Sequence, residues 1–195
     1  MPCVAVTSLQ CLQATGAPWA NRTNVTVVIT SGQGGTGFIG IQLAKLLSAT
    51  NVYTAASGAG IPFVESLGAH LVVDFTKQNI FDSLPDDSVD IVYDNYGARD
   101  PGTADKAVHA IRIGGVYLVM DTGGGGQISK NPKPGVTQIA FGLMDPSDRS
   151  KGLDILKPWF ERGQLQPHTQ TIYSIFKSAM HSTRIPRAAL SASSP

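Results

Sequence analysis

The chain has 195 residues, of which 42% are hydrophobic and 15% are charged, so it can build one substantial core and does not belong to the disordered class. Fifteen basic and fourteen acidic residues leave a formal net charge of +1, which excludes the broad basic field of proteins that bind nucleic acid or anionic lipid. The spacing of the two cysteines, Cys3 and Cys11, fits neither a redox pair nor a thiolate metal site.

The N-terminal region lacks the features of a targeting segment. No basic residue precedes Arg22, and polar residues such as Thr7 and Gln10 interrupt the apolar stretch that a signal peptide needs. No segment approaches the ~20 apolar residues of a membrane span. We therefore expect a cytoplasmic protein with reduced cysteines and with no membrane or nucleic-acid partner.

Short apolar segments alternate with segments of helical spacing along the chain. In chain order these patterns predict a helix over 4–12, a strand over 25–30, a helix from 38 to about 49, a strand over 51–56, a helix over 62–67, strands over 71–75 and 89–94, a helix over 104–113, strands over 116–120 and 136–143, and a helix over 151–162. Strands that alternate with helices imply right-handed crossovers and a sheet covered on both faces. The predicted fold class is α/β, an open doubly wound parallel sheet.

The turn between the first predicted strand and its helix has glycine at the three positions of a G-x-G-x-x-G pattern. Gly32 turns the chain sharply, Gly34 lets the backbone approach a pyrophosphate, and Gly37 lets the helix pack closely on the strand. The amides and the partial positive charge at the helix start favour an anion. The pattern predicts a Rossmann-like dinucleotide-binding domain, with Gly35 and Thr36 also among the cofactor contacts.

Two further pairs of residues follow predicted strands, at the carboxyl ends that border the ligand crevice of such a sheet. Asn95 and Tyr96 follow the fourth strand and are expected to contact ribose or nicotinamide; the alternative is an ordinary turn. Thr122 and Gly123 follow the fifth strand, where close approach to a nicotinamide requires small residues; the alternative is a flexible linker.

The histidines do not form a metal-binding pattern. His70, His109, His168 and His181 are scattered, without an i, i+4 pair or a carboxylate partner at ligand spacing. The cysteine cluster of a structural zinc lobe is also missing. We therefore expect no metal site.

Several segments, in order, resemble the cofactor-binding domain of the medium-chain dehydrogenase/reductase superfamily. The resemblance is carried by PCVAVTSLQCL (2–12), the glycine turn with IQLAK (41–45), ESLGA (65–69), VVDF (72–75), VDIVYDNYG (89–97) and IRIGGVYLVM (111–120). It spans about residues 2–173 and is closest to the zinc-independent, quinone oxidoreductase-like (zeta-crystallin-like) branch. It implies NADPH-dependent hydride transfer to a quinone or an α,β-unsaturated carbonyl, and a homodimer whose pairing edge is the strand over 136–143.

The same resemblance implies a dinucleotide-binding domain over 1–177. Residues 178–195 form an atypical tail rich in Ser, Ala and Pro, which we expect to be poorly ordered. The N-terminal GroES-like catalytic domain of such proteins is expected to be absent, and no catalytic residue is identified in the chain. An alternative function is therefore that of a catalytically inactive nucleotide-binding module or a truncated remnant.

The coenzyme is predicted from the region after the second strand. No acidic residue occurs between the glycine turn and Glu65, so the carboxylate that usually binds the adenosine ribose of NAD is missing. This favours NADP(H) over NAD(H), with Ser57 as a hydrogen-bond donor. The resemblance puts the lysine and tyrosine that often hold the 2′-phosphate at Gly60 and Phe75, which offer no charge and no hydroxyl; Lys77 is a distant substitute.

A second alternative is an extended short-chain dehydrogenase. Residues 34–40 also fit G-x-x-G-x-x-G, and Tyr173 and Lys177 fit a catalytic Tyr-x-x-x-Lys, in which the lysine lowers the tyrosine pKa for proton transfer. This alignment leaves two extra residues before the turn and puts Phe160 where the catalytic serine belongs. The medium-chain resemblance covers more of the chain.

Overall fold

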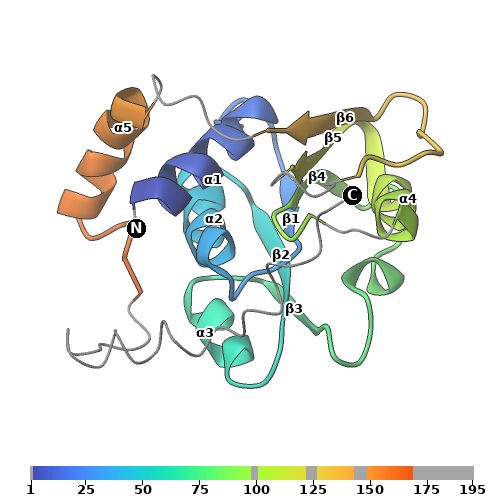
Figure 1. The fold of residues 1–195 in the computed structure, drawn as a ribbon, viewed down its shortest axis with the longest axis horizontal. Coiled ribbons are helices and arrows are strands. Elements are labelled where there is room, and N and C mark those ends of the chain that lie inside the picture. The colour runs from blue at the N-terminus through green and yellow to red at the C-terminus, as the bar shows by residue number, and fades with distance from the viewer. Residues whose placement is uncertain (1, 98–100, 122–126, 143–148, 169–195) are drawn as a thin grey trace, which may run out of the picture.

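The computed structural model describes residues 2–97, 101–121, 127–142 and 149–168, which form one six-stranded sheet with helices on both faces (Figure 1). In chain order the elements are α1 (Pro2–Ala14), β1 (Thr26–Ile29), α2 (Gly35–Leu46), β2 (Asn51–Ala56), α3 (Gly60–Ser66), β3 (Leu71–Asp74), the 3-10 helix η1 (Ile80–Ser83), β4 (Val89–Asp94), α4 (Pro101–Ala110), β5 (Ile111–Met120), β6 (Thr137–Phe141) and α5 (Arg149–Glu161). The predicted bounds of β2 and β4 coincide with the observed ones.

The strand order across the sheet is β3-β2-β1-β4-β5-β6, and all neighbouring strands pair in parallel. In the middle, Val28 of β1 pairs with Tyr53 of β2 on one side and with Val92 of β4 on the other. The chain runs outward from β1 to β3 and then returns to the other side of β1, which is the reversal of a doubly wound sheet. The predicted fold class is confirmed.

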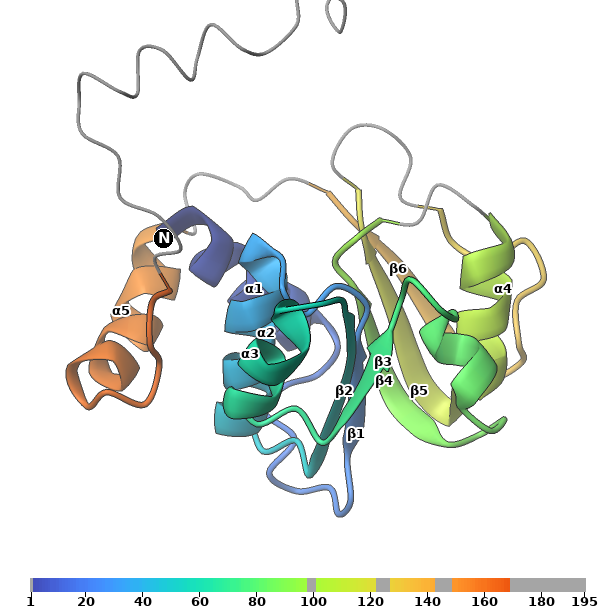
Figure 2. The ribbon, with the colours of Figure 1, turned by 90° about the horizontal axis from the view of Figure 1, so that it is seen from below.

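Each face of the sheet has its own hydrophobic core, and Figure 2 shows helices on both faces. α1, α2 and α3 cover one face, against strand residues such as Val27 and Ile91, and α5 packs on the outer side of α1. α4 and η1 cover the other face, against Val28 and Val92. Because strand side chains alternate between faces, a strand covered on both sides must be apolar nearly throughout, and β1 is buried at every position.

The start of β5 differs from the prediction, since residues 111–113 were predicted as the end of a helix and are strand. Ile111 pairs directly with Val89 of β4. The next two residues, both glycines, lie inside the strand: Gly114 has a φ of +82°, and a Cβ on Gly115 would lie 2.4 Å from a backbone oxygen of β4. Glycine is required here because β5 bends tightly against β4.

The polar stretch before β4, for which no element was predicted, contains η1. Asn79 caps it by accepting a hydrogen bond from the Phe81 amide at 3.0 Å. The predicted tail and the domain boundary at 177 lie outside the described residues, as does Leu143, the predicted end of β6. Among the described residues, no helix has both the length and the apolar character needed to cross a bilayer.

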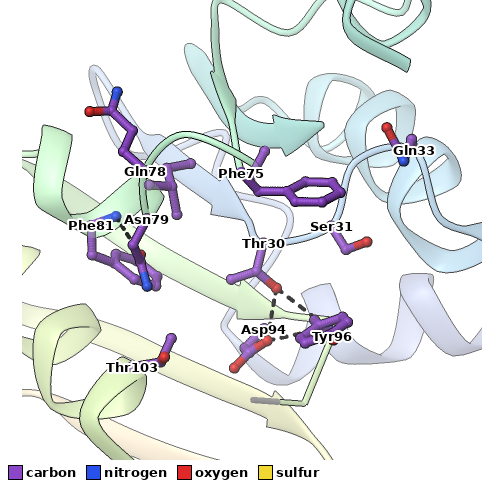
Figure 3. Close-up of a pocket in the computed structure, with 12 residues that line it drawn as sticks. Thr30, Ser31, Gln33, Phe75, Gln78, Asn79, Phe81, Asp94, Tyr96 and Thr103 are labelled. Carbon is purple, nitrogen blue, oxygen red and sulfur yellow. Dashed lines mark hydrogen bonds between the residues drawn. The ribbon is translucent and has the colours of Figure 1, made fainter. Parts of the chain in front are cut away.

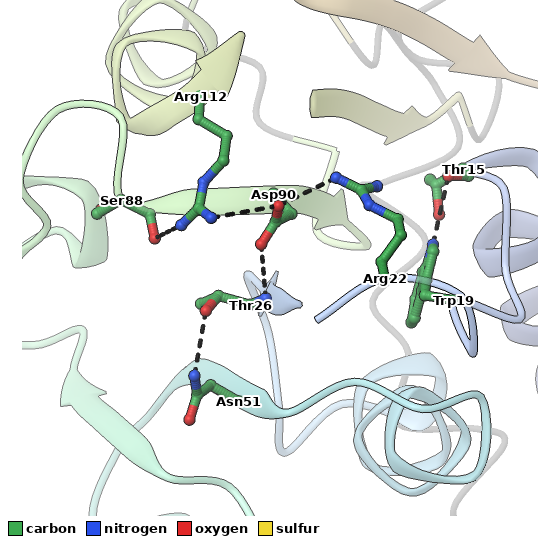
Figure 4. A network of polar contacts seen from close by, with 8 residues as sticks. All are labelled: Thr15, Trp19, Arg22, Thr26, Asn51, Ser88, Asp90 and Arg112. Carbon is green, nitrogen blue, oxygen red and sulfur yellow. Dashed lines mark hydrogen bonds and ion pairs between the residues drawn. The ribbon is translucent and has the colours of Figure 1, made fainter. Parts of the chain in front are cut away.

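A network of polar contacts joins elements at the amino end of the sheet (Figure 4). Asp90, near the start of β4 and 3% exposed, forms ion pairs with Arg22 at 3.1 Å and Arg112 at 3.5 Å. It also accepts a hydrogen bond from the Thr26 amide at 2.8 Å. A buried carboxylate requires such partners. The network thus ties β1, β4 and β5 together at the end of the sheet opposite to their carboxyl ends.

Cys11, on the inner side of α1, gives the fold a pH-dependent contribution to stability. Burial raises the pKa of its thiol from 9.0 to about 12, and its neighbour is the buried Tyr93. The folded chain therefore holds this proton more tightly than the unfolded chain. The contribution is fully present below pH 9 and is lost as the pH rises from 9 to about 12.

Urea unfolding on both sides of pH 9 is expected to show this decline in the free energy of unfolding. Cys11→Ala is expected to have a shallower decline than the wild-type chain, apart from any uniform loss caused by its smaller side chain. If the free energy of unfolding declined equally with pH in the two proteins, the pH-dependent contribution could not be assigned to Cys11.

Candidate functional site

The turn between β1 and α2 brings three elements into close contact. A Cβ built on Gly37 would lie 1.7 Å from the carbonyl oxygen of Ser31, so a larger residue cannot be placed there without moving backbone. The Gly32 amide donates to the Ala55 carbonyl of β2 at 3.0 Å, and a Cβ on Gly32 would lie 2.4 Å from Thr54 Oγ1. These two glycines allow β1, β2 and α2 to meet at one point of the sheet.

α2 begins at Gly35, earlier than predicted. The Gly34 carbonyl accepts hydrogen bonds from the amides of Gly37 and Phe38, both at 3.0 Å, so the glycine segment itself forms the first helical turn. The amides of Gly35 and Thr36 lie at the extreme start, where a helix has no preceding carbonyl to accept them. Together with the helix dipole, they offer N–H donors to an anion.

Asn95, directly after β4, holds this turn in place. Its Oδ1 accepts hydrogen bonds from the Ser31 amide at 2.9 Å and from Thr30 Oγ1 at 3.2 Å. Its Nδ2 donates to the Ser31 carbonyl at 2.9 Å and to Thr36 Oγ1 at 3.1 Å. Both ends of the carboxamide are engaged within the protein, so Asn95 positions the backbone of the turn and the start of α2.

Asp94, the last residue of β4, organises the loop that follows it. Asp94 is 1% exposed, and its carboxylate accepts hydrogen bonds from the amides of Tyr96 at 3.2 Å and Gly97 at 3.0 Å. It also accepts from Thr30 Oγ1 at 2.8 Å and shares that hydroxyl proton with Asn95 Oδ1. The Tyr117 hydroxyl donates to the Asp94 carboxylate at 2.9 Å. Burial, and then the neighbouring carboxylate, raise the pKa of Tyr117, so this hydroxyl keeps the proton it donates.

A cleft of about 610 Å³ opens at the carboxyl ends of the strands (Figure 3). The described residues that line it are Thr30, Ser31, Gln33, Ala55, Phe75, Gln78, Asn79, Ile80, Phe81, Asp94, Tyr96 and Thr103. Phe75 and Tyr96 lie on either side of Thr30 and are 52% and 77% exposed. Exposed aromatic rings at a cleft suit a planar ligand such as a purine base.

The end of β2 is connected to the glycine turn by a side chain. Gln33 Oε1 accepts a hydrogen bond from the Ser57 amide at 2.9 Å. Near it, a Cβ on Gly60 would lie 1.9 Å from the same oxygen. Lys77, the predicted distant substitute, is 79% exposed and pairs with Asp74 at 3.4 Å.

The structure brings most of the predicted site residues to one edge of the sheet. Those at the carboxyl ends of β1, β2 and β4 are Gly32, Gly34, Gly35, Thr36, Gly37, Ser57, Asn95 and Tyr96. Four other candidates, Thr122, Gly123, Tyr173 and Lys177, lie outside the described residues. Within the described ranges, no group of three or more His, Cys, Asp or Glu side chains could hold a metal ion.

Three residues of this edge were not predicted as site residues. Gln33 is one of the variable positions of the glycine pattern, and Asp94 directly precedes the predicted pair at the end of β4. Phe75 offers neither the charge nor the hydroxyl expected of a phosphate-binding residue, but its ring lines the cleft. For Asp94 and Phe75, the signal in the sequence was therefore their position at the end of a strand.

Residues 67–180, more than half of the chain, match the family model described as zinc-binding dehydrogenase. The chain is 34% identical over 143 residues to a 2-methylene-furan-3-one reductase from Solanum lycopersicum, covering 73% of this chain and 32% of that protein. It is 36% identical, with the same coverage, to an NADPH-dependent alkenal/one oxidoreductase, chloroplastic, from Arabidopsis thaliana. The chain thus spans about a third of the length of these curated relatives.

Solved structures share the fold. The quinone oxidoreductase from Coxiella burnetii superposes with a TM-score of 0.75 at 22% sequence identity, over 94% of this chain and 54% of that one. The Escherichia coli quinone oxidoreductase complexed with NADPH gives a TM-score of 0.66 at 16% identity, over 86% and 53% of the two chains. At these identities the likeness supports the fold alone.

Proposed function

Because this chain belongs to the zinc-binding dehydrogenase family of the medium-chain dehydrogenase/reductase superfamily, we propose that it is the coenzyme-binding part of an NADPH-dependent oxidoreductase that reduces quinones or α,β-unsaturated carbonyls. The observation that carries the proposal is the start of α2. There the amides of Gly35 and Thr36 lie at the reversal point of the sheet, beside the cleft. The names of the two curated relatives support the substrate class.

The residues of this edge fit the parts of a nicotinamide dinucleotide. The pyrophosphate is proposed to bind the amides of Gly35 and Thr36, because Gly34 and Gly35 have no side chains that would block its approach. The adenine is proposed to lie in the cleft beside Phe75 and Tyr96, and the adenosine ribose near Ser57. The nicotinamide, expected near Thr122 and Gly123, supplies the hydride when bound.

NADP(H) is the preferred coenzyme in this proposal. The end of β2 carries no carboxylate that would repel a 2′-phosphate, and the Arabidopsis relative is named as NADPH-dependent. The buried Asp94 carboxylate does not act as such a group, because the hydrogen bonds around it hold it within the loop after β4.

A titration that follows NADPH fluorescence tests the proposal, together with the oxidation of NADPH in the presence of an enone or a quinone. Saturable binding with substrate-dependent oxidation supports a reductase. Binding without oxidation supports the alternative, a nucleotide-binding module. Turnover abolished by Tyr173→Phe supports the short-chain dehydrogenase mechanism, and no binding of either coenzyme contradicts all three.

The remaining parts of the proposal come from the family resemblance. As in the branch that the sequence resembles, we propose zinc-independent chemistry; a chelator should then leave the substrate-dependent oxidation of NADPH unchanged. β6 is an edge strand, and we propose it as the pairing edge of a homodimer, to be tested by the solution mass of the chain.

We propose the cytoplasm as the compartment, to be tested by the location of a fluorescent fusion.

A further inference from the structure

We propose that Gln33 discriminates between the two nicotinamide coenzymes by presenting its side-chain –NH₂ group to the 2′ position of the adenosine ribose. This inference rests on the proposed function, because it assumes that a nicotinamide dinucleotide occupies the edge of the sheet described above. It concerns a residue in a variable position of the glycine turn, where no role follows from the G-x-G-x-x-G pattern itself.

The hydrogen bond between Gln33 and Ser57 fixes the orientation of the carboxamide. A backbone amide can only donate, so the group that faces the Ser57 amide at 2.9 Å must be the oxygen of Gln33. The –NH₂ group, with its two donors, must then face another way. Gln33 lines the cleft together with Ser31 and Phe75 (Figure 3), so a ligand in the cleft would meet this side chain.

The position of this group corresponds to the ribose hydroxyls. In dinucleotide-binding sheets of this type, the adenosine ribose lies at the carboxyl end of β2, where NAD-specific proteins carry an acidic residue. Here β2 ends at Ala56, and the next backbone donor, the Ser57 amide, is already bonded to Gln33. The carboxamide of Gln33 therefore stands where the discriminating side chain is expected, although it comes from the glycine turn.

Gly60 makes this arrangement possible. A Cβ at position 60 would lie 1.9 Å from Gln33 Oε1 and 2.8 Å from its Cδ. The Gly60 φ is not in the left-handed region, so the backbone conformation of α3 does not require glycine here. The missing side chain instead leaves space for Gln33. Gln33 and Gly60 are thus a matched pair, and an alanine at 60 would displace the carboxamide from the Ser57 amide without an obligatory change of fold.

The chemistry of the carboxamide explains the direction of the preference. Its –NH₂ donors can bind a phosphate, and its neutrality causes no repulsion of the 2′-phosphate dianion. A glutamate of the same shape keeps an oxygen for the Ser57 amide and puts a negative charge in place of the –NH₂. That charge repels the 2′-phosphate and accepts hydrogen bonds from ribose hydroxyls.

The test is a parallel titration of NADPH and NADH into the full chain and its variants, with a thermal melt for each protein. Gln33→Glu is expected to weaken NADPH binding by about tenfold or more and to strengthen NADH binding. Gln33→Ala and Gly60→Ala are expected to reduce the preference for NADPH without strengthening NADH. Gln13→Glu, which adds the same charge at an exposed position of α1, is the matched control and should change neither affinity.

The outcomes separate the two proposals. If the folded wild-type chain binds neither coenzyme, the proposed function is overturned, and this inference with it. If the wild-type chain binds NADPH while Gln33→Glu and Gln33→Ala leave the ratio of the two affinities unchanged, only the inference about Gln33 is overturned. A shift of the same size in Gln13→Glu would also overturn it, since the effect would then be one of net charge.

Discussion

A single methyl group at Gly37 is expected to abolish NADPH binding and to lower the free energy of unfolding by about 1–3 kcal/mol. The added Cβ would lie 1.7 Å from the Ser31 carbonyl oxygen and 2.9 Å from the Gly32 Cα. Both are backbone atoms, so no side-chain rotation relieves the clash, and the start of α2 must move away from β1. Alanine's better helix propensity, about 1 kcal/mol, offsets only part of this cost.

Thermal or urea unfolding of Gly37→Ala, together with an NADPH titration, measures both effects. Gly142→Ala is the matched control, because a Cβ there meets no atom within 4 Å and the backbone is not in the left-handed region. The control is expected to stay within about 0.5 kcal/mol of the wild-type chain and to bind NADPH normally. A Gly37→Ala protein with wild-type stability and affinity would refute the close packing of α2 on β1.

Asn95→Ala is expected to lower the free energy of unfolding by about 2–3 kcal/mol and the NADPH affinity at least about tenfold. The variant removes four hydrogen bonds, two of them to the Ser31 backbone, and leaves a partly buried amide and carbonyl without these partners. The contact with Thr36 Oγ1 is lost as well, so the first turn of α2 is less firmly held. The NADPH affinity is therefore expected to fall through the loss of support for the turn, in addition to the loss of any direct contact between Asn95 and the coenzyme.

Two comparisons make this prediction specific. Asn95→Asp keeps an acceptor for the Ser31 amide but loses the Nδ2 donors. Its free energy of unfolding and its NADPH affinity should therefore lie between those of the wild-type chain and of Asn95→Ala. Asn51→Ala removes a single bond, from Nδ2 to Thr26 Oγ1 at 3.2 Å, at the amino end of β2. It should cost some stability and leave NADPH affinity unchanged. An Asn95→Ala protein that loses stability but binds NADPH normally would show that the turn needs no such support.

The elements that the sequence predicted well are those whose local pattern and tertiary environment agree. The alternation of apolar strands and helices was sufficient for the sheet, and β2 and β4 have the predicted bounds. The predicted start of α2 was too late in the chain, because glycine and threonine are poor helix formers. That turn is helical because of distant partners: Asn95 binds Thr36 Oγ1 and Ser8 binds the Thr36 carbonyl.

The error at the start of β5 has the same cause. Apolar spacing continues from the helix into residues 111–113, and a glycine pair usually stops a helix. What makes this segment a strand is its pairing with Val89, a contact with a residue more than twenty positions earlier in the chain. Local patterns cannot reveal such pairing, so tertiary contacts decide the secondary structure at this boundary.

The sequence predicted those residues of the candidate site that directly follow the end of a strand. Counting residues after each strand identified Ser57, Asn95 and Tyr96 at the right edge of the sheet, but not what each side chain contacts. Asn95, predicted to contact ribose or nicotinamide, is hydrogen-bonded to the backbone of the glycine turn, and its contact with the coenzyme stays a prediction. The bond from Ser57 to Gln33 joins residues 24 positions apart and depends on the space left by Gly60, which only the fold can show.

The most direct test of the account is an NMR titration of the ¹⁵N-labelled chain with NADPH, read at the backbone amides of the glycine turn. We expect saturable binding, with the amides of Gly35 and Thr36 among those whose chemical shifts change most. Residues around Asp90, at the opposite end of the sheet, should change little. A folded chain whose Gly35 and Thr36 amides do not respond to millimolar NADPH or NADH would contradict the account.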